Sequence, residues 1–299
     1  MIVRPKPNQF AVLFTLKGSI AKRIALRTLM VTLLAAVIVL IEILEPSYFA
    51  KVNATPFTLL GLSLSIFMSF RNNACYDRWY EARKAWGEVL VRVRSVMRET
   101  QGIAEISLRA PLLRNLCGFA HALNARLRGE NEARASADWL SPPIDTGAPD
   151  HCGQILHQVG RQCSELEASG VISAWRYQLL ASHLTSLTQA QAVCDRIKTT
   201  PLPFPYTLLL HRTIYLFCIL LPFAMAESLG WLTPLFTAIV SYTFFGLDAI
   251  ADELEDPFGR DENDLPTDAL VRTLERDVLY ELGVSPLPPA AEPDDYVLR

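Results

Sequence analysis

The sequence predicts an all-α membrane protein with four transmembrane helices and a helical cytoplasmic region. Hydrophobic residues make up 51% of the 299 residues and charged residues 20%, which is a more apolar balance than that of a typical soluble protein. Long apolar runs recur along the chain, and the segments between them carry many charges at helical spacing. These observations together indicate membrane helices plus a water-exposed part.

A cytoplasmic or interfacial segment, residues 1–27, comes first, and its apolar piece around Phe10 and Phe14 is too short to span a bilayer. Residues 28–44 are the first spanning candidate. This run falls short of the roughly 20 apolar residues that a bilayer requires and contains Glu42, so flanking residues or other helices must shield it. Basic residues precede the run and no small-residue cleavage site follows it, which favours a retained anchor over a signal peptide.

The second helix of this hairpin is predicted to run from Thr55 to about Met97. Thr55 can cap its start, and Pro56 suits the first helical position. Only isolated glycines and no proline follow, so one helix of about 40 residues, roughly 60 Å long, crosses the membrane and continues into the cytoplasm. The hairpin with this extension covers residues 28–107.

Residues at a spacing of four form two stripes on the apolar part of this helix, Leu62, Ile66 and Phe70 on one and Gly61, Ser65 and Ser69 on the other. One stripe suits a pore and the small-residue stripe suits a neighbouring helix. Periodicity alone favours ordinary core packing of both stripes, and the pore is the alternative that stays open.

Residues 108–200 are predicted to form a cytoplasmic helical region. Residues 129–150 interrupt it with several prolines and are predicted to be a loop. Helical spacing resumes over residues 151–198, where Gly170 is the expected joint between two helices, the second of them starting near Val171.

The second membrane hairpin occupies residues 201–250, with spans at 206–226 and 231–250. Each span contains a proline, Pro222 or Pro234, which neighbouring helices can accommodate. His211 and Arg212 lie near the start of the third span, where snorkelling or a partner carboxylate is the ordinary explanation.

The chain ends in an acidic loop and an amphipathic helix, residues 251–284, and a tail, residues 285–299. The tail combines prolines with acidic residues and is predicted to be disordered. Basic residues cluster before Thr28 and after Phe70, while the connection between the first two spans holds only Lys51. The positive-inside rule therefore places both chain termini in the cytoplasm.

Several function classes are excluded. A net charge of -3 gives no basic domain for nucleic acid. The six cysteines include no C-x-x-C pair and are interpreted as reduced, and the five histidines include no helical metal pair. The acidic residues Asp252, Glu253, Glu255 and Asp256 cover several helical faces, whereas a catalytic pair must converge, so we expect no enzyme.

Three ordered segments carry a resemblance to a known family: PFTLLGLSLSIFMSFRNNACYDRWYEARKAWG, TPLPFPYTLLLHRTIYLFCILLPF and SYTFFGLDAIADELEDPFGRDENDLP. They resemble the bestrophins, most closely the bacterial members. The resemblance implies a homopentameric ion channel of the bacterial inner membrane, with the lipid bilayer, further copies of the chain and small monovalent ions as its partners. Chloride conductance is typical of the wider family and cation conductance is an alternative for bacterial members.

The resemblance also implies the site residues. Bestrophins form a hydrophobic neck from three apolar residues at a spacing of four, positions that match Leu62, Ile66 and Phe70 here. A second, cytoplasmic constriction falls on the helix that starts near Val171, where Trp175 and Leu179 are the candidates.

The acidic stretch DPFGRDEND matches the calcium clasp of eukaryotic bestrophins. Asp261 and Asp264 keep carboxylates at matching positions, while Arg260 adds a positive charge and Asn263 removes a negative one. We therefore expect a solvated, turn-forming loop and no required cofactor, with calcium at Asp261 and Asp264 as the alternative.

Two other functions are weighed against the channel. A membrane-anchored scaffold or signalling protein would use its cytoplasmic helices to bind a partner. A secondary transporter would require half-helices and buried charges at the midplane, for which only Pro222 and Pro234 offer a hint, with no strong intramembrane charge pair beside them.

Overall fold

The computed structural model describes residues 1–4, 15–45, 53, 55–144, 147 and 149–299. Helices make up 76% of the structure, which confirms the all-α class. The chain forms two compact units. We call Pro5–Trp79 with Pro201–Asp256 the apolar unit, and Met1–Arg4, Tyr80–Thr200 and Pro257–Arg299 the polar unit.

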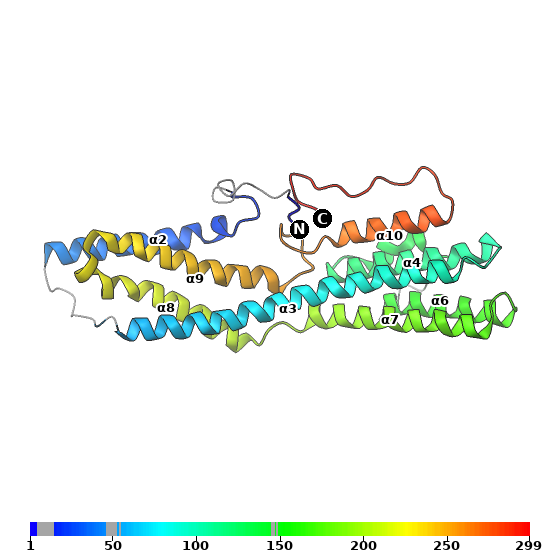
Figure 1. The fold of residues 1–299 in the computed structure, drawn as a ribbon, viewed down its shortest axis with the longest axis horizontal. Helices are drawn as coiled ribbons and strands as arrows, with labels where there is room; N and C mark the ends of the chain where they lie inside the picture. Colours follow the sequence, from blue (N-terminus) through cyan, green and yellow to red (C-terminus); the bar gives the residue numbers. More distant parts are fainter. Residues whose placement is uncertain (5–14, 46–52, 54, 145–146, 148) are drawn as a thin grey trace. The chain divides into compact units, whose positions relative to one another are not determined.

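The apolar unit contains α2 (Ala21–Leu44), the first part of α3 (Thr55–Glu99), α8 (Phe204–Leu229) and α9 (Thr233–Glu255) (Figure 1). The long helix predicted from Thr55 is confirmed as the unbroken α3. Asn53 supplies the side-chain acceptor at its start, through a 2.9 Å hydrogen bond from the Thr55 N–H.

Among the described residues, the segments long and apolar enough to cross a membrane are Ala21–Leu44 and the stretch Phe204–Glu255, which holds α8 and α9. The short 3₁₀ helix η2 (Gly230–Leu232) joins these two helices, and Gly230 adopts a positive φ of 48° that favours glycine.

The core of the apolar unit lies where its four helices meet. Its most buried side chains include Ile24, Met68, Ile214 and Phe245, each 0% exposed. The outer faces stay apolar, as the exposed stripe Leu29, Leu33 and Leu40 on α2 illustrates. A unit that is apolar inside and outside suits a lipid environment.

The polar unit is a helical bundle around α4 (Ile106–Leu127), with α6 (His151–Ala168), α7 (Ala174–Thr199) and α10 (Thr267–Glu281). The middle of helix α4 is buried on all sides, since every residue from Asn115 to Ala120 is buried. Such a helix is the centre of a bundle and not a solvated rod. Gly170, with φ +76°, separates α6 from α7 as predicted.

One predicted loop is partly helical. Residues 129–150 contain α5 (Glu132–Ser136) and the 3₁₀ helix η1 (Ala137–Trp139). The Asn131 side chain caps α5 by accepting the Arg134 N–H at 2.8 Å, while the prolines that favoured a loop come later in the segment.

The segment 285–299 also differs from the disorder that its composition predicts. Val297 is 8% exposed, and the backbone of residues 296–298 pairs with residues 1–3. The Arg299 carbonyl accepts the Ala269 N–H at 2.7 Å, which ties the segment to α10. Backbone pairing between the two chain ends gives no periodic signal in sequence.

Two predictions concern residues outside those that the structure describes. They are the interfacial piece around Phe10 and Phe14 and the basic residue Lys51.

Candidate functional site

The three predicted neck residues are exposed on one face of α3. Leu62, Ile66 and Phe70 have exposed fractions of 61%, 48% and 60%. The intervening Leu64 and Met68 are 2% and 0% exposed and pack in the core. Because two residues turn a helix by about 200°, the stripe Leu62, Ile66 and Phe70, which we call the neck stripe, lies on the side of α3 opposite the core of the apolar unit. The stripe is therefore not part of the subunit's own core.

The small-residue stripe beside it has a mixed environment. A Cβ atom added at Gly61 would lie 3.2 Å from Cζ of Phe217 on α8, so this glycine allows a close contact inside the unit. Ser65 is exposed, and its hydroxyl donates to the Gly61 carbonyl at 2.8 Å.

A charge cluster with a buried ion pair at its centre follows the neck stripe directly. Arg71 has a side-chain exposure of 0% and donates from Nη1 to Oδ1 of Asp248 at 2.7 Å and from Nη2 to Oδ1 of Asp252 at 2.6 Å. The third carboxylate, Glu255, lies 3.6 Å from Nη2. The second oxygen of Asp248 is 2.9 Å from Nδ1 of His211 on α8. We call these five residues the Arg71 cluster.

Sequence reasoning missed this cluster. Asp248, Asp252 and Glu255 follow one another at steps of four and three, which places them on one face of α9. The expectation that the carboxylates do not converge was wrong for Asp252 and Glu255, which both face Arg71, and Asp248 was not among the residues considered. The partner carboxylate anticipated for His211 is Asp248. The ion pair between Arg71 and Asp248 is a further feature that the sequence analysis did not predict.

The two prolines do not divide helices. Helix α8 continues through Pro222, and Pro234 lies in the first turn of α9, where a proline is ordinary. The half-helices that a transporter site would require are therefore not present in α8 and α9.

The candidates for the second constriction lie near the start of α7. Ser173 caps this helix by accepting the Arg176 N–H at 3.3 Å. Trp175 is 76% exposed, and Leu179, one turn later, is partly exposed. Both side chains are available to a partner, and their role stays a prediction.

The acidic turn before α10 is built around Asp264. This residue is 5% exposed, and its Oδ2 accepts the Asp261 N–H at 2.7 Å. Asp261 itself is exposed, and Arg260 pairs with Glu130. Among the described residues, no group of three or more metal-ligating side chains could hold a metal ion. The geometry is that of a self-satisfied turn.

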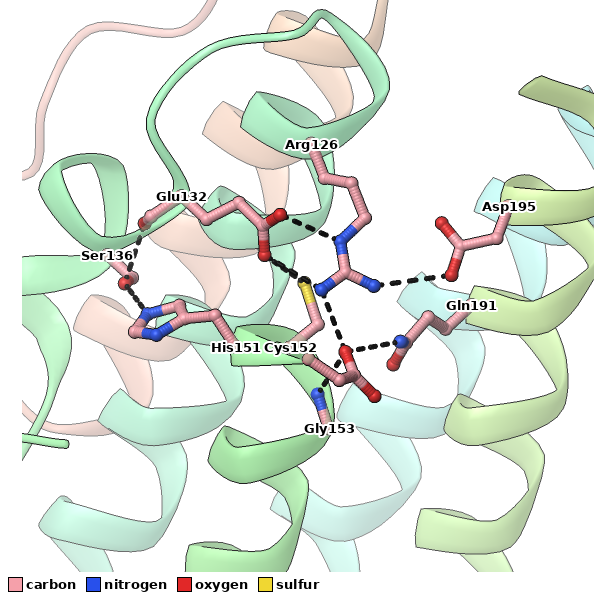
Figure 2. A network of polar contacts seen from close by, with 9 residues as sticks. Arg126, Glu132, Ser136, His151, Cys152, Gly153, Gln191 and Asp195 are labelled. Carbon is pink, nitrogen blue, oxygen red and sulfur yellow. Dashed lines mark hydrogen bonds and ion pairs between the residues drawn. The ribbon is translucent and has the colours of Figure 1, made fainter. Parts of the chain in front are cut away.

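The polar unit contains one dense network with catalytic residue types (Figure 2). Arg126 pairs with Glu132 at 2.9 Å, Asp150 at 2.7 Å and Asp195 at 3.3 Å, and so links α4 to α5, α6 and α7. Burial raises the pKa of the neighbouring Cys152 thiol, despite the proximity of Arg126. A protonated thiol is a poor nucleophile, and the carboxylates are neutralised by Arg126. The network is therefore structural.

Comparisons with known proteins agree on one family. Residues 1–280 match the model of the bacterial/fungal bestrophin proteins. A voltage-dependent anion channel-forming protein of Mesorhizobium japonicum is 40% identical over 96% of this chain and 94% of its own. A protein of the same description from Escherichia coli K12 is 36% identical over 98% of both chains.

The solved structures point the same way. A bacterial bestrophin homologue from Klebsiella pneumoniae matches with a TM-score of 0.82 and 35% identity, covering 88% of this chain and all of the other. The family and these relatives are ion channels and not enzymes. The chain thus belongs to the bacterial/fungal bestrophin family.

Proposed function

We propose that this protein is a homopentameric channel of the bacterial inner membrane that passes small monovalent ions passively. The observation that carries the proposal is the apolar stripe Leu62, Ile66 and Phe70. It is exposed on the side of α3 opposite the core of the apolar unit. The relatives of the chain are named anion channel-forming proteins. A stripe excluded from the subunit's own core is available to line a pore between copies.

In this proposal each subunit supplies four membrane helices: α2, the first part of α3, α8 and α9. Five copies of the stripe form a narrow, poorly hydrated neck that gates by dewetting and removes part of an ion's hydration shell. The neck carries no charge, so it does not select the sign of the ion. Trp175 and Leu179 form the second constriction, and both chain termini lie in the cytoplasm.

The names of the relatives favour anions, and chloride is the first ion to test. The purified protein in liposomes is exposed to opposed sodium and chloride gradients, and the reversal potential is measured. A potential near the chloride equilibrium value supports an anion channel, and one near the sodium value identifies a cation channel. Absence of flux of either ion would contradict the channel and favour the scaffold alternative.

A further inference from the structure

The apolar unit holds α3 through polar contacts at the level of the neck stripe. The hydroxyl of Tyr206 on α8 donates to the Phe67 carbonyl at 3.0 Å, next to Ile66 in the chain. Arg71, which follows Phe70, is bound by the carboxylates of α9. Ile66 and Phe70 are thus each followed in the chain by a residue that is hydrogen-bonded to another helix.

Adjacent residues have opposite environments here. Phe70 is 60% exposed while Arg71 is 0% exposed. Because successive residues differ by about 100° around a helix, the direction of the Arg71 side chain determines the direction of Phe70. A rotation of α3 by about 100°, the angle between successive residues, would bring Phe70 toward the core of the apolar unit.

Apolar packing alone does not fix this rotation. Contacts such as those of Leu64 and Met68 are non-directional, and α3 also carries exposed apolar side chains outside the core, Leu59 on the face of Ile66 and Phe67 between the two faces. The guanidinium of Arg71, by contrast, bonds two carboxylates one helical turn apart, so both its direction and its height along α9 are specified.

We propose that Arg71 is the positioning residue of the neck. Its bonds to Asp248 and Asp252 hold α3 at the rotation that turns Phe70 away from the core of the apolar unit. His211 assists by binding the second oxygen of Asp248. This inference rests on the proposed function, since the neck belongs to it.

A purely stabilising role is the competing explanation, and a double substitution separates the two. Replacing both partners of a buried ion pair by apolar side chains of similar size often leaves stability unchanged or raises it. In Arg71→Met with Asp248→Leu the two most buried partners are replaced together, while Asp252 and Glu255 are 35% and 21% exposed and can be solvated, so we expect the fold to be kept and the directional bonds to be lost. Arg94→Met with Asp277→Leu is the matched control, because it removes the exposed 2.7 Å pair between α3 and α10 in the polar unit.

The rotation of α3 is measured by maleimide labelling of single introduced thiols. Phe70→Cys samples the exposed face and Met68→Cys the buried face, and the six native cysteines are all buried. With Arg71 in place, the thiol introduced at position 70 should react at least about tenfold faster than the one at position 68. In the double variant the ratio of the labelling rates at positions 70 and 68 should fall toward one. In the control variant this ratio should equal that of the parent protein.

An unchanged ratio in a folded double variant overturns the proposal. If that variant does not fold, Arg71→Lys replaces it. An ammonium lacks the two-pronged geometry of the guanidinium, so the ratio should fall part of the way, and a ratio equal to that of the parent overturns the proposal. Flux is measured in parallel. A parent protein without flux contradicts the proposed function, whereas a conducting parent with unchanged labelling contradicts only the role of Arg71.

Discussion

At the scale of single residues, the polar groups that matter most are buried and satisfied by distant partners. Arg71 and Asp248 are 177 positions apart in the chain, and Asn124 and Arg128 bind Asp268 across 144 and 140 positions. Sequence spacing shows which of these side chains share a helical face, but it does not show which helix they meet. That is why Arg71 was missed, whereas the stripe Leu62, Ile66 and Phe70 is a local pattern within one helix that the sequence shows.

His121 gives a residue-scale prediction about pH. Its ring stacks on Trp139 with a centroid separation of 5.3 Å, and burial, assisted by the charge of Arg272, lowers its pKa from 6.5 to about 4. In the unfolded chain this histidine takes up a proton below pH 6.5, whereas in the folded chain it does so only near pH 4. The stability that the neutral ring provides is complete above pH 6.5 and is lost as the pH falls from there to about 4.

We expect this loss to be about 3 kcal/mol. His121→Phe keeps the stacking and cannot titrate, so its free energy of unfolding should depend less on pH across that window. Denaturant unfolding at several pH values measures it. Equal pH dependence of the parent and the variant would show that His121 does not contribute.

At the scale of elements, α3 combines two roles in one continuous helix. Its first part packs Leu64 and Met68 against α2, α8 and α9, and its last part belongs to the polar unit, where Arg94 pairs with Asp277 on α10. The length of α3 was predictable because no proline interrupts it. The start of α5 was not predicted, because a single cap, Asn131, outweighs the loop-like composition around it.

The acidic turn before α10 gives an element-scale prediction. Asp264→Ala removes the acceptor of the Asp261 N–H and should lower the free energy of unfolding by about 1–3 kcal/mol. Asp261→Ala removes only an exposed carboxylate and should change it by less than about 0.5 kcal/mol. Thermal unfolding in detergent measures both effects.

The same experiment tests calcium. Since Asp264 already serves the turn, we expect millimolar calcium to leave the unfolding temperature of the parent protein unchanged. A rise in that temperature that is lost in both Asp261→Ala and Asp264→Ala would instead establish a calcium site.

At the scale of the whole molecule, a single subunit exposes apolar surface that other copies of the chain are expected to cover. Exposed apolar residues cover α2, α9 and the neck face of α3, and lipid and neighbouring subunits are the expected surroundings. The number of copies leaves no trace in one chain, because it depends on contacts between chains. The family resemblance implies five.

The mass of the protein in detergent tests this stoichiometry. Five copies of the 33.4 kDa chain give about 167 kDa after correction for bound detergent. Light scattering coupled to size exclusion measures it, and a monomer or dimer would remove the pore that the neck stripe is proposed to line.

The central claim is that Leu62, Ile66 and Phe70 line the ion pathway, and Ile66→Ala tests it most directly. Shortening this side chain should widen and wet the neck, and a barrier lowered by about 1 kcal/mol would raise the flux about fivefold. Leu33→Ala is the control, because it trims a side chain that is 57% exposed on α2. In liposomes, the account predicts increased flux for Ile66→Ala and parental flux for Leu33→Ala; a conducting parent whose flux is the same in both variants would contradict it.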